Sequence, residues 1–394
     1  MSMIIFGDSF SFPEGLASTN RVHTYAKGFY ENGVKVHVIC FRSQYNSAGD
    51  GNVNGINFYH PFGKRERSKF IFVRNWHKLL RYFKAVRLLR KINKEDKVLA
   101  IAVYSVLFRT HVLAWFLAKL SNSKLLKECG EHPLRLHQGN VIRKNVGVLK
   151  FKIETYLSDG IICISQYLID FHKYYGIPSY KLVHIPSTVD TGRFTVSNNI
   201  PLAFDYILYC GSLTVSKDGV NILVESFARI IEKHPDVSLV LIGKGDTMEE
   251  ENFIRELVKN LDISSKVFFL GQMSRNEIPR YMNHSKILAL ARPESMVADA
   301  GFPSKLTEYL ATGVPVVVTE VGEIPVYLKD KENAFLAKPG NVEAFANKLD
   351  FVLNNYQFAK KVASKGKLLT ETVFNYNFQA ARIIDYAERY NSNL

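Results

Sequence analysis

The segment ADAGFPSKLTEYLATGVPVVV, residues 298–318, combines groups that could bind a phosphate and a diol. Pro303 and Ser304 are typical of the start of a helix, with Ser304 as its N-cap. The free N–H groups of the first turn, together with Lys305, would attract an anion. We place Glu308 just inside the first turn, where it either favours the helix dipole or accepts hydrogen bonds from a vicinal diol such as a ribose. Taken alone, this segment favours the first of these two roles.

A second candidate anion site is CGSLTVSKDG, residues 210–219. Gly211 and Ser212 follow an apolar strand, and small residues there let a ligand approach the backbone closely. Lys217 stands at the start of the next predicted helix, where free N–H groups also favour an anion, although an ordinary turn with a surface lysine would look the same. Gly243 ends the following strand, but the spacing of a P-loop or a dinucleotide fingerprint is missing, which favours a tight turn.

In the first half, Gly15 lies in a loop after the first strand, and the strand at 124–128 delivers Glu131 and His132 to its carboxyl end. A single histidine is usually structural, whereas one beside an acid at a strand end could contact a substrate, and both interpretations stay open. The sequence has no Asp-x-Asp pair and no cluster with metal-ligand spacing, so we predict no required divalent ion.

Residues 64–91 carry 11 Lys or Arg against one Glu. Within this segment Trp76, Leu79, Leu80, Phe83 and Val86 form an apolar stripe, flanked by Lys78, Arg81, Lys84, Arg87 and Lys91. A basic amphipathic helix with aromatic residues is typical of a surface that lies on anionic lipid headgroups. The alternatives are an ordinary covering helix and a helix that binds nucleic acid. We favour the anionic membrane surface, with Lys78, Arg81, Lys84 and Arg87 facing it, and expect no nucleic acid partner.

These residues must be positioned by a chain of 394 residues with a net charge of +14 and 47% hydrophobic residues, which suggests two soluble domains and an acidic partner. Short apolar runs alternate with amphipathic helical stretches, the pattern of parallel sheets covered by helices. We predict strands at 2–6, 35–40, 56–59, 98–104, 124–128, 160–164, 181–185, 206–210, 238–243, 267–271, 287–291, 314–318 and 334–337. Helices are predicted at 18–32, 70–93, 106–120, 146–157, 165–175, 219–233, 248–261, 274–283 and 304–312.

A polar, Pro-bounded stretch at 186–201 is predicted to be a linker between the domains. The domains are therefore expected at 1–190 and 201–373, with a C-terminal helix at 374–394 that packs back toward the first. The four cysteines fall in or at the end of apolar runs without a CxxC pair, which predicts buried thiols. The first residues lack the basic and apolar pattern of a signal peptide, so we expect a cytoplasmic protein.

Several of these motifs together resemble a GT-B-fold retaining glycosyltransferase of the large family 4, in the branch that builds bacterial surface polysaccharides. They are FPEGLASTNRVHTYAKGFYENGVKVHVI, EHP, HIPSTVDTGRF, GSL…KDGV, LVLIGKGD, VFFLGQM and FPSKLTEYLATGVPVVVTEVGEIP. The resemblance covers essentially the whole chain. It implies two tandem Rossmann-like, doubly wound α/β domains facing a central cleft.

The resemblance also implies a nucleotide-diphosphate sugar as donor, with UDP or GDP as the nucleotide, and no required cofactor. The donor-binding residues would be Gly15, Gly211, Ser212, Lys217, Gly243, Gly271, Gln272, Gly301, Phe302, Pro303, Ser304, Lys305 and Glu308. Lys217 would neutralise the diphosphate, Glu308 would hold the ribose hydroxyls, and Gly271 with Gln272 would contact the base. The catalytic residues would be His132, Glu131 and Lys217, with His132 facing the transferred sugar or the acceptor.

The implied activity is transfer of a sugar to a lipid-linked saccharide in capsule, O-antigen or exopolysaccharide synthesis. It would take place on the inner face of the cytoplasmic membrane, with the diphosphate leaving group stabilised by fixed cations and N–H donors instead of a metal. Two residues depart from the family pattern: Ala300 stands where a first glutamate is usual, and Ser212 where an arginine is often found. An epimerase or phosphorylase of the same fold, or a catalytically silent nucleotide-binding scaffold, are the alternative functions.

Overall fold

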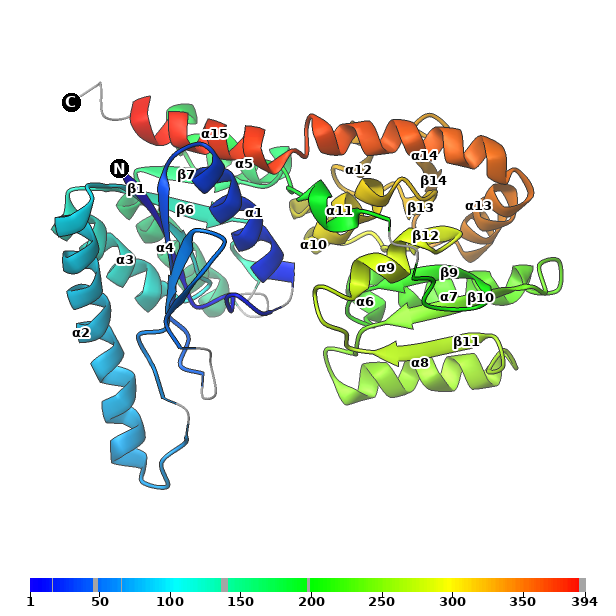
Figure 1. The fold of residues 1–394 in the computed structure, drawn as a ribbon, viewed down its shortest axis with the longest axis horizontal. Helices are drawn as coiled ribbons and strands as arrows, with labels where there is room; N and C mark the ends of the chain where they lie inside the picture. Colours follow the sequence, from blue (N-terminus) through cyan, green and yellow to red (C-terminus); the bar gives the residue numbers. More distant parts are fainter. Residues whose placement is uncertain (16, 45–48, 65, 136–140, 197–198, 390–394) are drawn as a thin grey trace. The chain divides into compact units, whose positions relative to one another are not determined.

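The chain forms two compact units, each built around its own parallel sheet (Figure 1). The structure is a computed structural model and describes residues 1–15, 17–44, 49–64, 66–135, 141–196 and 199–389. Unit 1 comprises Met1–Pro186 and the residues from Tyr376 onward, and unit 2 comprises Ser187–Asn375. Unit 2 is therefore inserted into unit 1 along the chain.

Unit 1 contains an eight-stranded sheet in the order β3-β4-β2-β1-β5-β6-β7-β8, in which only the β3–β4 pair is antiparallel. The strands are β1 (Ser2–Gly7), β2 (Lys35–Cys40), β3 (Gly51–Val53), β4 (Ile56–Tyr59), β5 (Val98–Tyr104), β6 (Lys124–Cys129), β7 (Gly160–Cys163) and β8 (Leu182–His184). The helices are α1 (Ala17–Glu31), α2 (Ile71–Glu95), α3 (Phe108–Ser121), α4 (Val141–Leu157), α5 (Gln166–Tyr174), α15 (Tyr376–Arg389) and the 3-10 turn η2 (Ser179–Lys181).

Each face of this sheet is covered by its own set of helices. Apolar residues of α1 and α15, among them Phe29 and Ile383, pack on one face with Met3 and Ile5 of β1. Residues of α2 and α3 pack on the opposite face with β1, β2, β5 and β6. Burial on both faces explains the continuous apolar runs in the central strands.

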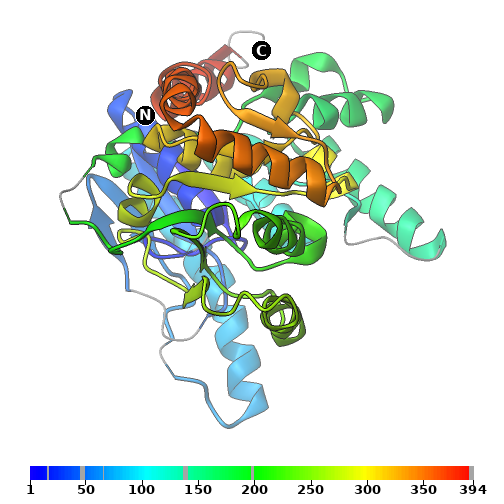
Figure 2. The same ribbon diagram turned by 90° about the vertical axis from the view of Figure 1, so that its right-hand side faces the viewer.

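Unit 2 contains a six-stranded, fully parallel sheet in the order β11-β10-β9-β12-β13-β14. The strands are β9 (Asp205–Cys210), β10 (Val237–Ile242), β11 (Val267–Gly271), β12 (Ile287–Leu290), β13 (Val316–Thr319) and β14 (Phe335–Ala337). The helices are α6 (Val215–Asp218), α7 (Val220–Ile230), α8 (Met248–Asn260), α9 (Ile278–Asn283), α10 (Met296–Ala300), α11 (Ser304–Thr312), α12 (Ile324–Tyr327), α13 (Val342–Asn354), α14 (Tyr356–Glu371) and the 3-10 turn η3 (Thr191–Phe194). Figure 2 looks onto this unit and shows helices on both sides of the sheet.

The predicted alternation of strands and helices is confirmed, with several differences. Strand β3 was not predicted, although it pairs with β4 around an Asn54-Gly55 turn in which both residues have positive φ. Helix α4 begins five residues before the predicted start at 146, and α10 was not predicted. The apolar segment at 98–120 is a buried strand followed by α3, as predicted, and all four cysteines are buried free thiols.

The prediction of a linker at 186–201 is wrong for its first part. Residues from Ser187 belong to unit 2, and Thr191–Phe194 form η3, which contacts α9 and α11. Phe194 is buried, and Asp190 caps the turn by accepting a hydrogen bond from the backbone N–H of Gly192. A polar sequence was mistaken for a linker because its single anchoring aromatic residue gives no periodic signal.

Candidate donor site in unit 2

The order of strands in unit 2 reverses between β9 and β12, which lie side by side at the centre of the sheet. In open parallel sheets, ligands bind outside the carboxyl ends of the strands at such a switch point. The backbone that follows β9 begins at Gly211, and the chain after β12 leads through Arg292 to α10 and α11. The residues of unit 2 that were predicted to bind the donor therefore lie around this edge or along it.

Gly211 and Gly243 make a close backbone contact at this edge. A Cβ atom on Gly243 would lie 1.8 Å from the carbonyl oxygen of Gly211, and Gly243 has a φ of 135°. A Cβ atom on Gly211 would lie 2.2 Å from Nζ of Lys305 and 2.8 Å from Oη of Tyr209. Both positions require glycine, and the one at 211 leaves the Lys305 ammonium directly beside bare backbone.

Lys305 is held by a buried carboxylate. Its Nζ donates to Oδ2 of Asp218 at 2.7 Å and to the hydroxyl of Tyr209 at 2.9 Å. Burial lowers the pKa of Lys305, and the pairing with Asp218 opposes that shift. Burial by itself would raise the pKa of Asp218, but the charges of Lys305, Arg292 and Lys217 bring it below its usual value. The site is thus a charged pair with additional cations around it.

Lys217 lies in the short helix α6 and its side chain is exposed. It does not begin the long helix of this βα unit as predicted, because Gly219, with a φ of 66°, separates α6 from α7. The ammonium still influences both Asp218 and Lys305 electrostatically. Ser212 is half-buried, and its carbonyl oxygen lies 2.6 Å from the hydroxyl of Tyr209.

Glu308 forms an ion pair that the sequence did not predict. Its Oε1 accepts from Nη1 of Arg193 at 2.8 Å, and Arg193 also donates through Nη2 to the carbonyl oxygen of Arg275. Both charged side chains are mostly shielded from solvent. Glu308 is the fifth residue of α11, so the prediction that it lies in the first turn is wrong, and so is the alternative that it serves the helix dipole from there.

The start of α11 also differs in detail from the prediction. The residue before the helix is Pro303, with an extended backbone and no side-chain cap, and Ser304 is the first helical residue, so Ser304 is not the N-cap. Phe302 turns inward and packs on Tyr327 and Phe374, which leaves only its backbone for a ligand. Gly301 is half-buried and ends α10.

At the edge strand β11, the carbonyl oxygen of Gly271 accepts a hydrogen bond from the N–H of Gly243. Gly271 has a φ of 68°, and Gln272 that follows it is exposed. The structure therefore brings Gly243 together with Gly211 and Gly271 through backbone contacts. The prediction that Gly243 simply forms a tight turn understated this link between three neighbouring strand ends.

The predicted residues of unit 1 are described within that unit. Gly15 is exposed in the loop between β1 and α1, and Glu131 is exposed and pairs with Arg135. His132 is buried, with its ring 4.6 Å from the ring of Phe171, and burial lowers its pKa. Its Nδ1 accepts a hydrogen bond from the N–H of Leu134 at 3.1 Å, so the proton of the neutral ring resides on Nε2.

The basic segment of unit 1 forms α2, and one of the four cations predicted to face a membrane is buried. Arg81, which we expected to face a membrane, is only 4% exposed. Its Nη1 donates to the carbonyl oxygen of Phe41 at 2.9 Å, and its guanidinium stacks on the rings of Phe41 and Tyr82. Lys78, Lys84 and Arg87 are exposed as expected. No helix in the described part of the chain is both long and apolar enough to span a bilayer.

Asp218, Tyr209 and Arg193 are the site residues that sequence reasoning missed. Arg193 belongs to the motif HIPSTVDTGRF, which was recognised in the sequence. A charged residue within that motif could have indicated a role at the site. Tyr209 lies within an apolar strand, and Asp218 lies next to Lys217. Neither sequence position indicates that the side chain makes a buried polar contact. Within the described residues, no group of three or more His, Cys, Asp or Glu is placed to hold a metal ion.

Comparison with known proteins relates the chain to glycosyltransferases. Residues 192–369 match the model of the family "Glycosyl transferases group 1". An uncharacterized glycosyltransferase of Haemophilus influenzae is 30% identical over 166 residues, which are 42% of this chain and 44% of that protein. The amylovoran biosynthesis glycosyltransferase AmsK of Erwinia amylovora is 26% identical over 54% of this chain and 52% of that protein. The chain thus spans about half the length of these curated relatives.

The crystal structure of Anabaena Alr3699/HepE in complex with UDP and glucose superimposes with a TM-score of 0.71 at 17% identity. The match covers 98% of this chain and 99% of that one. This likeness, together with the two parallel-sheet units, shows that the fold is GT-B, with two Rossmann-like domains. The match to the group 1 glycosyl transferases lies in residues 192–369, which make up most of unit 2.

Proposed function

We propose that the protein transfers a sugar from a nucleoside diphosphate sugar, with UDP or GDP as the nucleotide, to a saccharide acceptor. The observation that carries this proposal is the ammonium of Lys305, fixed by Asp218 beside the bare backbone of Gly211 at the switch point. A diphosphate that binds there meets a cation whose position is already set, with Lys217 nearby. Breaking the glycosyl–phosphate bond leaves negative charge on the diphosphate, which such fixed cations stabilise most.

The test is a thermal-shift panel of UDP, GDP, ADP, CMP and dTDP, followed by donor sugars of the best nucleotide. We expect one nucleoside diphosphate to raise the melting temperature and its sugar derivative to be consumed only when a saccharide acceptor is added. Consumption without an acceptor would instead support an epimerase, and a need for inorganic phosphate would support a phosphorylase. If no nucleotide binds, the proposal fails.

Glu308 is proposed to bind the ribose hydroxyls while Arg193 holds its carboxylate in place. A direct experiment compares UDP, or the preferred nucleotide, with its 2′,3′-dideoxy analogue. The wild-type protein should bind the ribose form at least tenfold more tightly, and Glu308→Ala should remove most of that difference. Equal discrimination in the variant would assign the ribose to other residues. Gly271 and Gln272 keep their proposed place beside the base.

In unit 1, we assign His132 the role of a hydrogen-bond donor to the transferred sugar or the acceptor. Its Nδ1 already accepts from the backbone, and its lowered pKa keeps the ring neutral near pH 7. A neutral ring with its proton on Nε2 can donate there but cannot take a proton at that atom. This is compatible with a retaining reaction in which the diphosphate itself accepts the acceptor's proton. Glu131 and Lys217 remain proposed participants.

We further propose that the acceptor is linked to a lipid and that α2 lies on the inner face of the cytoplasmic membrane, as in the synthesis of a capsule, lipopolysaccharide or other surface polysaccharide. The support is the exposed apolar side of α2, where Phe72 is 84%, Trp76 57% and Phe83 65% exposed, alongside Lys78 and other cations. Exposed aromatic residues with a basic surround fit an anionic headgroup layer. The name of the Erwinia relative, an amylovoran biosynthesis glycosyltransferase, agrees with a surface polysaccharide.

Flotation with vesicles tests this docking. The double variant Trp76→Ser, Phe83→Ser should bind phosphatidylglycerol vesicles at least tenfold more weakly while its stability is unchanged, because both side chains are exposed. The matched control is Phe116→Ser, Leu120→Ser on α3, which removes two exposed apolar side chains from a different helix. Equal loss in both double variants would contradict docking through α2.

A further inference from the structure

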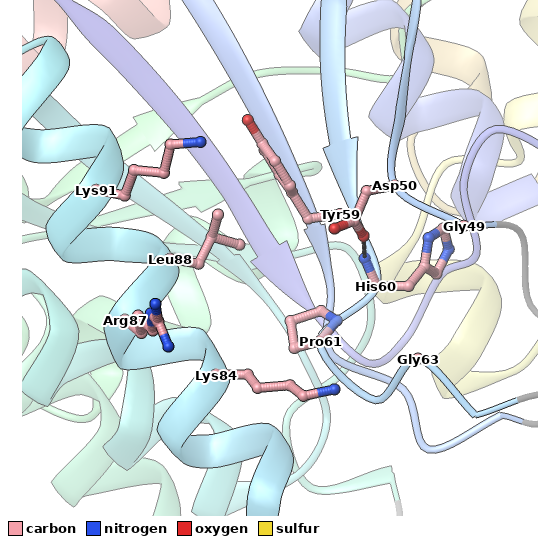
Figure 3. A pocket seen from close by; sticks show the side chains of 10 residues that line it. All are labelled: Gly49, Asp50, Tyr59, His60, Pro61, Gly63, Lys84, Arg87, Leu88 and Lys91. Carbon is pink, nitrogen blue, oxygen red and sulfur yellow. Dashed lines mark hydrogen bonds between the residues drawn. The ribbon is translucent and has the colours of Figure 1, made fainter.

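A pocket of about 660 Å³ opens in unit 1 between the C-terminal half of α2 and the end of β4. Its lining consists of Gly49, Asp50, Tyr59, His60, Pro61, Gly63, Lys84, Arg87, Leu88 and Lys91 (Figure 3). A pocket of this size suits a small ligand or the head of a larger one. It lies wholly within unit 1 and shares no residue with the donor site in unit 2.

The α2 wall of the pocket is cationic. Lys84, Arg87 and Lys91 recur at helical spacing and share one side of α2, with Leu88 between them. Figure 3 shows Lys84 reaching from the helix toward Gly63, and a Cβ atom on Gly63 would lie 3.6 Å from the Lys84 Nζ. In the described part of the chain, none of the three forms an ion pair with a carboxylate.

The opposite wall offers hydrogen-bonding groups and an apolar surface. Asp50 is the one carboxylate of the lining, and its Oδ1 already accepts from the N–H of His60 at 2.7 Å. Burial raises the pKa of Tyr59, and its protonated hydroxyl already lies 3.3 Å from Nδ1 of His37. The ring of Tyr59, Pro61 and Leu88 supply apolar surface next to the cations. Such a lining suits an anionic group attached to an apolar chain.

We propose that this pocket binds the phosphate or diphosphate at the head of the lipid-linked acceptor. This inference rests on the proposed function, because it names the group by which that acceptor is held. The same helix carries the exposed residues Trp76 and Phe83 that we propose to dock on the membrane. A helix that lies at headgroup level places its cations where lipid phosphates are found, and three cations can neutralise a diphosphate.

The test uses two triple variants of equal charge change on the same helix. Lys84→Gln, Arg87→Gln, Lys91→Gln alters the pocket, whereas Lys78→Gln, Arg90→Gln, Lys94→Gln removes three exposed cations outside it. Binding is measured to phosphatidylcholine vesicles that contain a long-chain prenyl diphosphate and to phosphatidylglycerol vesicles of equal surface charge. Inorganic pyrophosphate is titrated separately as the free anion.

We expect the pocket variant to lose at least tenfold in affinity for the prenyl diphosphate vesicles relative to the control variant, with a similar modest loss in both for phosphatidylglycerol. Equal losses on both kinds of vesicle in the two variants would overturn the proposal, since only general charge attraction would remain. A pocket-specific loss for pyrophosphate without one for the prenyl lipid would also overturn it, in favour of a site for free phosphate.

The readouts also separate this inference from the proposed function. The nucleotide is proposed to bind in unit 2, whereas the pocket lies in unit 1. The preferred nucleotide should therefore raise the melting temperature of the pocket variant as much as that of the wild-type protein. If no nucleotide binds to any form, the glycosyltransferase proposal fails while the vesicle comparison still decides what the pocket binds. If sugar transfer proceeds but the two triple variants are equivalent, only the pocket assignment fails.

Discussion

At the scale of single residues, the candidate donor site is organised by a buried charge pair. Removing Lys305 and Asp218 from water costs several kcal/mol per ion, which their attraction and the hydrogen bond to Tyr209 must offset. Such a pair contributes little net stability, but its two members depend on each other. We interpret Asp218 as the group that fixes Lys305 at the strand end, where an incoming phosphate would share its protons.

The first prediction concerns this dependence. Lys305→Ala should lower the free energy of unfolding by about 3–5 kcal/mol, because Asp218 would keep a buried charge without its partner. The double variant Lys305→Met, Asp218→Asn should recover at least half of that loss and still fail to bind nucleotide. Urea unfolding and nucleotide titration measure the two effects. Recovery of nucleotide binding in the double variant would show that Lys305 does not contact the phosphates.

The second prediction separates a collision from backbone strain. Gly211→Ala places a Cβ atom 2.2 Å from the Lys305 Nζ, so the ammonium must move and nucleotide affinity should fall at least tenfold. Gly340→Ala is the control, because Gly340 has a φ of 68° but no atom within 4 Å of the new Cβ. It should cost about 1 kcal/mol of stability and leave nucleotide affinity unchanged. Equal affinities in the two variants would exclude Lys305 as the displaced group.

At the scale of elements, α2 shows why a helical pattern does not identify its own buried face. The apolar stripe through Trp76, Leu79 and Phe83 satisfies helical periodicity, yet these side chains are exposed. The buried residues are Arg81, Ala85, Leu89 and Ile92. Ala85 is small enough for close approach to the sheet. The guanidinium of Arg81 donates from Nη1 to the Phe41 carbonyl and stacks on two aromatic rings, while its Nε has no hydrogen-bond partner.

The third prediction follows from this orientation. Arg81→Ala should destabilise the protein by about 1–3 kcal/mol, because a buried carbonyl loses a charged donor and two rings lose a stacking partner. Lys78→Ala, at an exposed position of the same helix, should change stability by less than about 0.5 kcal/mol. Thermal or urea unfolding of both variants measures these changes in stability. If both are neutral, the buried placement of Arg81 is wrong.

Much of the fold could be predicted from the sequence, because every strand pair except β3–β4 is parallel and the strands are apolar runs between helical stretches. The Asn54-Gly55 hairpin carried a strong turn signal that was overlooked, since β3 has only three residues and little apolar character. The glycines, Lys305 and Glu308 were recognisable from motifs. The Arg193–Glu308 pair was not, because it joins residues 115 positions apart through tertiary packing alone.

At the scale of the whole molecule, several histidines are buried in unit 1. Burial lowers the pKa of His111 to about 3 and that of His172 to about 4. Nε2 of His111 lies 3.1 Å from the Ser158 hydroxyl, and Nδ1 of His172 donates to the Leu168 carbonyl oxygen. Each ring stays neutral in the folded protein at pH values at which the unfolded chain takes up a proton.

The fourth prediction is the resulting pH dependence. These histidines contribute full stability above about pH 6.5, the unfolded pKa, and the contribution is lost as pH falls toward the folded values near 4 and 3. Each group contributes up to about 1.4 kcal/mol per pH unit within that window. Burial raises the pKa of Glu128 in the folded protein. Its contribution to stability therefore grows as pH falls, in the opposite direction to that of the histidines.

Urea unfolding between pH 4.5 and 6.5 measures this slope. His172→Gln should reduce the slope by up to about 1.4 kcal/mol per pH unit, because the new glutamine side chain can still donate a hydrogen bond but cannot be protonated. The same change at His111 should reduce it by a similar amount. A slope that is the same in the wild type and both variants would mean that neither ring is buried in its neutral form.

The position of α15 has a consequence for how the protein is made. Four residues of this helix, Ala380, Ile383, Ile384 and Ala387, complete the apolar layer on the α1 face of unit 1, yet they are translated after all of unit 2. On the ribosome, unit 2 can therefore reach its final packing while the larger part of unit 1, although synthesised first, still exposes part of its core. Until residues 376–389 have been synthesised and have emerged, the nascent chain exposes this part of the unit 1 core, which a chaperone would recognise.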